Sequence, residues 1–179
     1  MSFRLFAALP IPTEIAESLT RLQTGVPGAS WRSPAAMHLS LRFFGEVNDE
    51  TIEALDHQLA HIRCQPFGLT IEGVGHFGRE EPRALWVGIR SQPSLILLAK
   101  SCERAARQVG LEIERRAYVP HITLAYLTET PLDSVLDFER RHGARHIPGW
   151  VADRFYLYSS WVGGRGENPY RIEAEYPLI

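Results

Sequence analysis

Two tetrapeptides of one pattern, His38–Leu41 (HLSL) and His121–Leu124 (HITL), constrain the fold of this chain more than any other feature. They stand 83 residues apart (121 − 38), and the helices predicted after them, from Asn48 and from Pro131, keep that interval (131 − 48). An interval shared by a motif and by the element that follows it indicates an internal duplication. We therefore expect two copies of a helix, strand, helix, strand, strand unit, arranged as two similar lobes that face one another.

The spacing of hydrophobic residues predicts whether each segment forms a helix or a strand. Helical spacing predicts helices over residues 12–23, 48–64, 93–110 and 131–143. Alternating or continuous apolar runs predict strands within residues 3–9, 37–46, 67–77, 83–89, 121–127, 150–160 and 168–179. The predicted fold class is α+β, with two pseudo-symmetric lobes, each a small, mainly antiparallel sheet with flanking helices, and an active-site cleft between them. Residues 1–179 are expected to form this single bilobal domain.

Strand side chains alternate between the two faces of a sheet, and this alternation divides the first motif by face. The apolar face takes Leu39, Leu41 and Phe43, and the polar face takes His38, Ser40 and Arg42. In the second motif, His121 and Thr123 share a face in the same way. Each strand is therefore expected to offer an imidazole and a hydroxyl to the space between the lobes.

The overall charge provides no general attraction for anions. The 179 residues carry 19 Lys plus Arg against 21 Asp plus Glu, a formal net charge of −2, so an anionic partner must be held by a local site. Cys64 and Cys102 have no metal-binding or redox spacing and are expected to be free thiols. With no signal-peptide pattern and no apolar run that could span a bilayer, we expect a cytoplasmic protein without a membrane partner.

Two histidines and two hydroxyls suit acid-base chemistry. One imidazole can accept a proton from an attacking water while the other, protonated, donates one to a leaving oxygen. Ser40 and Thr123 can donate hydrogen bonds to non-bridging phosphoryl oxygens. Phosphodiester cleavage fits this set best, because a cyclic phosphate has an internal leaving alkoxide that needs a proton. A serine hydrolase fits less well, since the chain has no nucleophile elbow and no acid paired to orient a base.

Two other interpretations of the histidines stay open. Each could be a core histidine whose ring is satisfied by a backbone carbonyl, as buried polar groups usually are, although a matched pair on duplicated strands disfavours this. Each could also bind zinc, but a zinc site needs a third strong ligand, and no cysteine or carboxylate accompanies either motif. No metal ligand is therefore predicted.

With these motifs the chain resembles the two-histidine phosphoesterases, and within them the RNA 2',3'-cyclic phosphodiesterases, also called 2'-5' RNA ligases. The resemblance runs through RLFAAL, WRSPAAMHLSLRFFGEV, GVGHFGREEPRALWVGI, YVPHITLAYL, FYLYSS and YRIEAEYPLI. It implies a bilobal fold whose cleft hydrolyses a terminal 2',3'-cyclic phosphate of RNA to a 2'-phosphate, with no metal or organic cofactor. By the family's pattern, His38 donates a proton to the leaving oxygen and His121 accepts one from water.

The chain departs from the family's pattern at two positions. Ser40 stands where threonine is more usual, which keeps the hydroxyl donor. The second motif is often followed by arginine two residues after its leucine, a contact for phosphate, and here that position is Tyr126. The positive charge is then expected from Arg42 or Arg4, or else substrate affinity is reduced.

Weaker signals point to further substrate contacts. Five aromatic residues could stack on a nucleobase: Trp31, Phe43, Phe44, Trp86 and Trp161. Most aromatic residues, however, belong to the hydrophobic core. His76 lies near a turn that can reach the cleft rim. His57 and His61 stand four apart on a helix without a third ligand and are expected on a solvated face. Residues 163–169 (GGRGENP) are expected to form a mobile hairpin loop at the cleft edge.

The leading interpretation is a metal-independent cyclic phosphodiesterase acting on RNA ends, with 2'-5' ligation as its reverse reaction. One alternative is a cyclic phosphodiesterase for a small nucleotide, such as an ADP-ribose cyclic phosphate. Another is a non-catalytic RNA-binding module, which the presence of both histidines disfavours, because binding alone requires no acid and base. No protein partner is required, and a monomer is expected.

Overall fold

The computed structural model describes residues 3–161 and 170–179. Its helices are α1 (Thr13–Thr20), the 3-10 helix η1 (Pro34–Ala36), α2 (Asp49–Ala60), α3 (Pro93–Gln108) and α4 (Leu132–His142). Its strands are β1 (Phe3–Pro10), β2 (Ala29–Trp31), β3 (His38–Glu46), β4 (Phe67–Leu69), β5 (Ile71–Phe77), β6 (Ala84–Ile89), β7 (His121–Leu127), β8 (Trp150–Ala152), β9 (Arg154–Trp161) and β10 (Tyr170–Pro177). The predicted α+β class is confirmed, and the predicted elements differ from the observed ones mainly at their ends.

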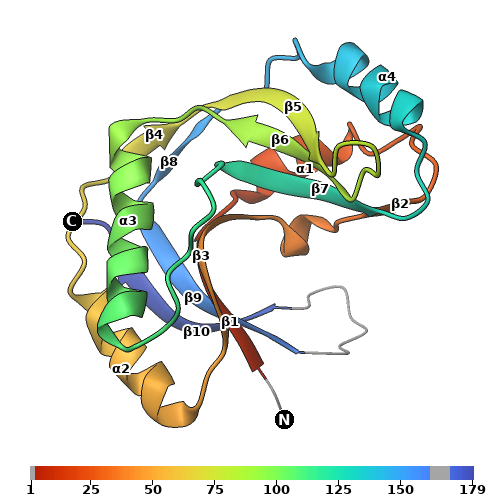
Figure 1. Ribbon diagram of the computed structural model, residues 1–179. Coiled ribbons are helices and arrows are strands. Elements are labelled where there is room, and N and C mark those ends of the chain that lie inside the picture. The colour runs from red at the N-terminus through yellow and green to blue at the C-terminus, as the bar shows by residue number, and fades with distance from the viewer. Residues whose placement is uncertain (1–2, 162–169) are drawn as a thin grey trace.

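One sheet of eight strands runs through the molecule. Its order is β10-β9-β1-β3-β7-β6-β5, with β2 paired to β7, while β4 and β8 form a separate two-stranded sheet. β3 and β7 join through a single bridge pair, Leu39 with Ile122, so the large sheet divides there into two halves. We call these halves with their helices the β1 lobe (β10, β9, β1, β3, α2 and α3) and the β6 lobe (β5, β6, β7, β2, α1 and α4). Figure 1 shows the β6 lobe above the β1 lobe.

The lobes do not coincide with the two halves of the sequence. β1 pairs with β3 on one side and with β9 on the other, so the β1 lobe combines strands from both ends of the chain. α3 packs on β3, although it precedes β7 in the sequence, and α4 packs on β5. Each lobe is thus built from segments of both halves of the sequence, so the expectation that each predicted unit forms one lobe is wrong, while each half still supplies one histidine strand.

Amphipathic helices cover one face of each half of the sheet. α2 begins where the Asn48 side chain accepts a hydrogen bond from the Thr51 backbone N–H at 2.8 Å, a cap that contributes about 1 kcal/mol. α3 begins with Pro93 at its first position and buries one apolar face, which includes Leu95 and Leu98, in the core. No helix within the described ranges is long and apolar enough to cross a membrane.

A β-bulge lies at the last residue of each motif. Leu41 in β3 and Leu124 in β7, the last residue of each motif, are extra residues relative to the partner strands β1 and β6. An extra residue shifts the alternation of faces by one. The bulge in β3 turns Arg42 toward the helices and Phe43 toward the opposite face, and the bulge in β7 places Tyr126 as the other places Phe43. The regular alternation predicted for the first motif therefore ends at Leu41.

Candidate active site

His38 and His121 occupy the first positions of β3 and β7 and make matching hydrogen bonds. Nδ1 of His38 lies 3.2 Å from the carbonyl oxygen of Ala36, and Nδ1 of His121 lies 2.6 Å from that of Val119. A carbonyl oxygen only accepts, so each neutral ring donates from Nδ1 and keeps its lone pair on Nε2. Nε2 is therefore the atom of each ring that is prepared to accept or deliver a proton.

Burial makes both imidazoles poor bases in the absence of a ligand. It lowers the pKa of His38 from 6.5 to about 4, an effect opposed by the Ala36 carbonyl and reinforced by the positive charge of Arg32. Burial also lowers the pKa of His121, against the effect of its bond to Val119. Both rings are neutral at pH 7, and a negative charge placed beside them raises the pKa of each.

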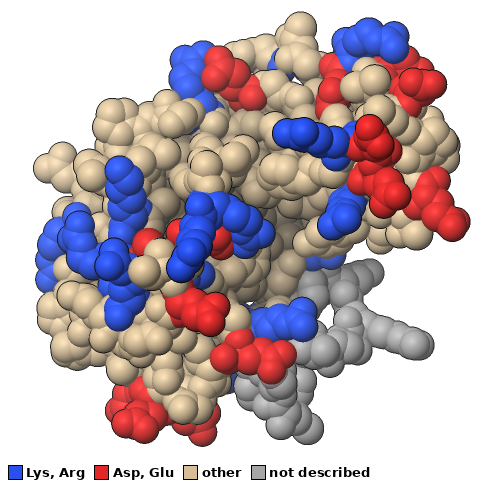
Figure 2. Space-filling view, in the orientation of Figure 1, with Lys and Arg blue, Asp and Glu red and all other residues tan. Residues whose placement is uncertain are grey.

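The bridge pair between β3 and β7 brings the two motifs to the line where the lobes meet. In this antiparallel register, His38 lies level with Thr123, and Ser40 lies level with His121. The two rings are close enough that a charge on His121 lowers the pKa of His38. Figure 2 shows the molecule hollowed between the lobes, with blue Lys and Arg side chains around the hollow.

The hydroxyls of Ser40 and Thr123 share the cleft face with the histidines. Both residues are half-buried, and neither hydroxyl bonds to another residue within 3–161 or 170–179. A half-buried hydroxyl without a protein partner has its donor available to an incoming group. The structure therefore brings together the two imidazoles and the two hydroxyls that the sequence singled out.

Different aromatic side chains flank the two histidines. The ring of Phe6 lies 4.7 Å from that of His38, and the edge of Tyr170 meets the same imidazole at 5.0 Å. On the other lobe, Phe77 meets His121 edge to face at 4.8 Å. These rings bury the imidazoles, which is the physical cause of their lowered pKa values.

Trp86 completes the wall beside His121, and a glycine makes room for it. Its ring centroid lies 6.0 Å from that of His121 and 5.5 Å from that of Phe77. A Cβ at Gly75 would lie 2.4 Å from the indole, so only glycine lets the ring lie against β5. Sequence reasoning named Trp86 as an aromatic candidate but gave no role to Gly75, although a glycine inside a predicted strand is a signal of close approach.

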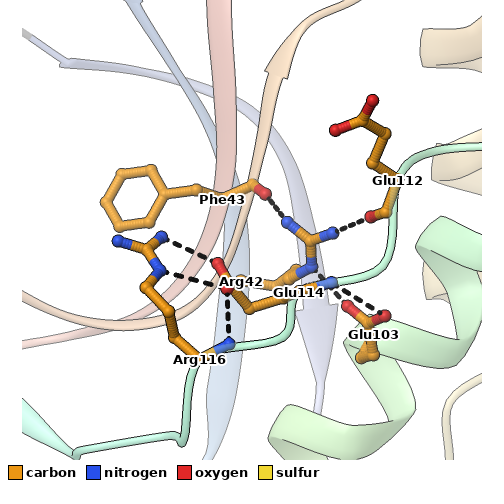
Figure 3. Close-up of polar contacts among 6 residues, drawn as sticks. All are labelled: Arg42, Phe43, Glu103, Glu112, Glu114 and Arg116. Carbon is orange, nitrogen blue, oxygen red and sulfur yellow. Dashed lines mark hydrogen bonds and ion pairs between the residues drawn. The ribbon is translucent and has the colours of Figure 1, made fainter.

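The expectation that Arg42 shares the face of Ser40 is wrong. The bulge turns its side chain toward α3, where Nε donates to the Glu103 carboxylate at 2.5 Å and a terminal nitrogen donates to the Glu112 carbonyl at 2.5 Å (Figure 3). The guanidinium also contacts the Phe43 carbonyl oxygen. Arg42 therefore joins β3 to α3 and to the segment before β7, with its charge already neutralised by a carboxylate.

Two other predicted substrate contacts lie away from the histidines. His76 sits between cleft-facing Gly75 and Phe77 on β5, so it points to the other face, where Nδ1 lies 2.5 Å from the Glu139 carboxylate of α4. That register contradicts the placement of His76 at the cleft rim. Arg4 is exposed on β1, and its guanidinium lies 3.7 Å from the Glu46 carboxylate.

The remaining candidates divide between core and cleft. Phe44 is buried in the core, and Trp31 lies beside Phe138 with ring centroids 6.1 Å apart. Phe43 is 54% exposed and lies 5.3 Å from Phe6, on the cleft face. The side chain of Trp161 and the glycine-rich segment 163–169 lie outside the described residues.

The helical histidine pair has no ligand geometry. The rings of His57 and His61 lie 4.5 Å apart, and Nδ1 of His61 bonds to the His57 carbonyl oxygen. Both residues are exposed. In the part of the chain that the structure describes, no group of three His, Cys, Asp or Glu is placed to hold a metal ion.

Arg32 is the charged residue near the motifs that sequence reasoning missed. Its guanidinium lies over the ring of Tyr126, 5.3 Å from the centroid, and donates to the Tyr170 hydroxyl at 2.8 Å. Its charge also lowers the pKa of His38. No local pattern points to this residue, because the pairing of β2 with β7 brings it to the site.

Comparisons with known proteins agree on one family. The profile of the 2'-5' RNA ligase superfamily matches residues 11–158. An RNA 2',3'-cyclic phosphodiesterase of Thermotoga maritima is 32% identical over 176 residues, covering 91% of this chain and 89% of the relative. The protein of the same name from Escherichia coli K12 is 38% identical over 125 residues, covering 68% of this chain and 70% of the relative.

Solved structures share the same fold over the full chain. LigT of E. coli, crystallised with 3'-AMP, superposes with a TM-score of 0.80 at 29% identity, covering 99% of both chains. TT0787 of Thermus thermophilus superposes with a TM-score of 0.75 at 25% identity, covering 98% of this chain and 97% of its own. Usb1 of Kluyveromyces marxianus, at 8% identity and a TM-score of 0.52, shares the fold alone.

Proposed function

The chain belongs to the 2'-5' RNA ligase superfamily, and we propose that it hydrolyses the terminal 2',3'-cyclic phosphate of RNA to a 2'-phosphate. The observation that carries this proposal is the matched pair of imidazoles. His38 and His121 come from equivalent strands of two lobes, and each ring is held through Nδ1 by a carbonyl two residues upstream. Such a pair leaves two Nε2 atoms for proton transfer at one phosphate.

Each imidazole has a separate task in the proposed reaction. Nε2 of His121 accepts a proton from water as the water oxygen attacks phosphorus. The bond between phosphorus and the 3' oxygen breaks, and His38, protonated at Nε2, delivers that proton to the leaving 3' oxygen. One water is consumed, and the product carries a 2'-phosphate and a 3'-hydroxyl. His38 requires its proton before this step, and the substrate's negative charge favours its protonation by raising its pKa.

The two hydroxyls support the same displacement. Ser40 and Thr123 donate hydrogen bonds to the non-bridging phosphoryl oxygens, where charge is held as the water attacks. The antiparallel register around Leu39 and Ile122 supports this role, because a hydroxyl beside the histidine of the other strand makes a donor available on both sides of one phosphate. With a 5'-hydroxyl in place of water as the nucleophile, the same displacement breaks the bond between phosphorus and the 3' oxygen and joins the two ends through a 2'-5' linkage.

The proposal includes the setting in which the protein acts. Residues 1–179 work as one bilobal domain and as a monomer, because a single chain supplies both histidines. No metal or organic cofactor takes part. The thiols of Cys64 and Cys102 are unpaired, which suits the reducing conditions of the cytoplasm, where RNA ends are processed.

The test is incubation with a short RNA that ends in a 2',3'-cyclic phosphate, with a chelator present. We expect a 2'-phosphate product at a rate that the chelator does not change. Since positioned acid-base groups contribute about a hundred-fold or more, His38→Ala and His121→Ala should each lower kcat/KM by at least that factor. His57→Ala, on an exposed helix face, is the matched control.

Three results would contradict the proposal. They are a 3'-phosphate product, a requirement for metal, and activity that survives both substitutions. Running the same assay on adenosine 2',3'-cyclic monophosphate and on a small dinucleotide-like cyclic phosphate separates an RNA enzyme from one that prefers a small nucleotide. Binding of the RNA without turnover would identify a non-catalytic module.

A further inference from the structure

Arg32 is held beside the second motif, although it precedes the first motif in the sequence. Its backbone N–H donates to the carbonyl oxygen of Leu124 at 2.8 Å. The side-chain amide of Gln23 donates to the carbonyl oxygens of Arg32, at 2.7 Å, and of Leu124, at 3.2 Å. These bonds fix the backbone of residue 32 at the end of the HITL sequence.

Two tyrosines orient the Arg32 guanidinium. It lies 5.3 Å from the ring centroid of Tyr126 and 5.7 Å from that of Tyr170, and one terminal nitrogen donates to the Tyr170 hydroxyl at 2.8 Å. Stacking on aromatic faces fixes the plane of a guanidinium without neutralising its charge. With five N–H donors, the group keeps a fork available for two oxygens.

The charge of Arg32 has no counter-ion among the described residues. Arg32 is half-buried, and no carboxylate within residues 3–161 or 170–179 pairs with it. Arg42, in contrast, is bound to Glu103. The Arg32 charge is also close enough to His38 to lower the pKa of that ring. A half-buried cation beside the two histidines, with no carboxylate partner in the described part of the chain, is suited to bind an anion.

We propose that Arg32, stacked on Tyr126 and fixed by Tyr170, binds the non-bridging oxygens of the substrate phosphate. This proposal rests on the proposed function. It also identifies the residue that supplies positive charge to the phosphate when position 126 is tyrosine and not arginine. The family's pattern often has an arginine at position 126 itself, and in this chain the tyrosine at that position supports the guanidinium of Arg32, the residue directly after β2. The positive charge is thus supplied from a different place in the sequence to the same cleft face.

The experiment compares Arg32→Ala, Arg32→Lys and the double variant Arg32→Ala with Tyr126→Arg. Hydrolysis of the cyclic-phosphate RNA is measured as kcat and KM, and binding of adenosine 2'-monophosphate is measured by calorimetry. Loss of a charge-assisted bond to phosphate should lower kcat/KM and affinity roughly 10- to 100-fold in Arg32→Ala. Arg32→Lys should fall between Arg32→Ala and the native protein, because it keeps the charge without the fork. The double variant should recover most of the loss.

A structural role for Arg32 gives a different result. It would lower the thermal stability of Arg32→Ala, and Tyr126→Arg would not restore binding. Arg42→Gln serves as the matched control, since it removes an arginine that joins β3 to α3. It should lower the thermal stability and leave KM and the affinity for adenosine 2'-monophosphate within about twofold of the native values. If Arg32→Ala does not fold, kcat/KM and the affinity for adenosine 2'-monophosphate are compared between Arg32→Lys and Arg32→Gln. The proposal then predicts higher values for Arg32→Lys.

The outcomes separate this proposal from the proposed function. If Arg32→Ala folds, hydrolyses RNA and binds adenosine 2'-monophosphate like the native protein, the role of Arg32 is wrong, while the proposed phosphodiesterase activity is unaffected. A loss that neither lysine nor Tyr126→Arg recovers also overturns it. If the native protein binds adenosine 2'-monophosphate through Arg32 but does not hydrolyse the cyclic phosphate, the proposed enzymatic activity is wrong, while the contact between Arg32 and phosphate is supported.

Discussion

Acid should destabilise this protein more when His38 is present than when asparagine replaces it. In the unfolded chain the imidazole binds a proton near pH 6.5, whereas in the folded protein burial delays protonation to about pH 4. Between these values the unfolded state carries the extra proton, so lowering the pH favours unfolding, and stability rises again with pH. Asparagine retains a donor for the Ala36 carbonyl but has no titrating group.

The magnitude follows from the two pKa values. Each pH unit across which only the unfolded state is protonated costs about 1.4 kcal/mol. Moving from pH 7 to pH 4.5 should therefore lower the free energy of unfolding by about 2 kcal/mol through His38 alone. Carboxylates and the other histidines titrate in both proteins, so their effect cancels when the two proteins are compared.

Urea unfolding at pH 7 and pH 4.5, in buffers without phosphate, measures this difference. The native protein should lose about 2 kcal/mol more than His38→Asn between the two pH values. Equal losses would show that His38 binds its proton in the folded state as readily as in the unfolded one. The assignment of a buried, neutral His38 in the free protein would then be refuted.

Two further substitutions test the walls of the cleft. Gly75→Ala should displace the Trp86 indole, lower the free energy of unfolding by about 1–3 kcal/mol and lower kcat/KM. Tryptophan fluorescence measures the displacement, and RNA hydrolysis measures kcat/KM. An unchanged fluorescence spectrum and an unchanged rate would contradict this prediction. His76→Ala should lower the free energy of unfolding by about 1 kcal/mol, because His76 bonds to Glu139 on the helix side, and should leave kcat/KM within about twofold. A larger fall in kcat/KM with unchanged stability would return His76 to the cleft.

The local pattern of the sequence was enough to predict the kinds of elements and the two central side-chain pairs. The spacing of apolar residues predicts a helix or a strand because each element buries its own repeating face. The same rule, applied to HLSL and HITL, placed each histidine with its hydroxyl on one face, and the bridge pair of β3 with β7 shows these faces meeting where the lobes join.

Local pattern failed where neighbouring strands changed the alternation. The period of two assumes a regular ladder, and the bulge at Leu41 is defined only by the pairing of β3 with β1. That one extra residue sent Arg42 to Glu103 and brought Phe43 to the cleft. His76 was misplaced for a related reason, because a turn nearby says nothing about which face a strand residue takes.

The paired histidine motifs and their common interval were determined by the sequence alone, because they depend only on residue types and their spacing. Which arginine faces the histidines was decided only by the tertiary structure. Arg42 follows the first motif directly, but the register of β3 on β1 turns it away. Arg32 reaches the site because β2 pairs with β7 and because Tyr126 lies beneath its guanidinium. Both outcomes depend on contacts between strands distant in the chain, which no local pattern of residues records.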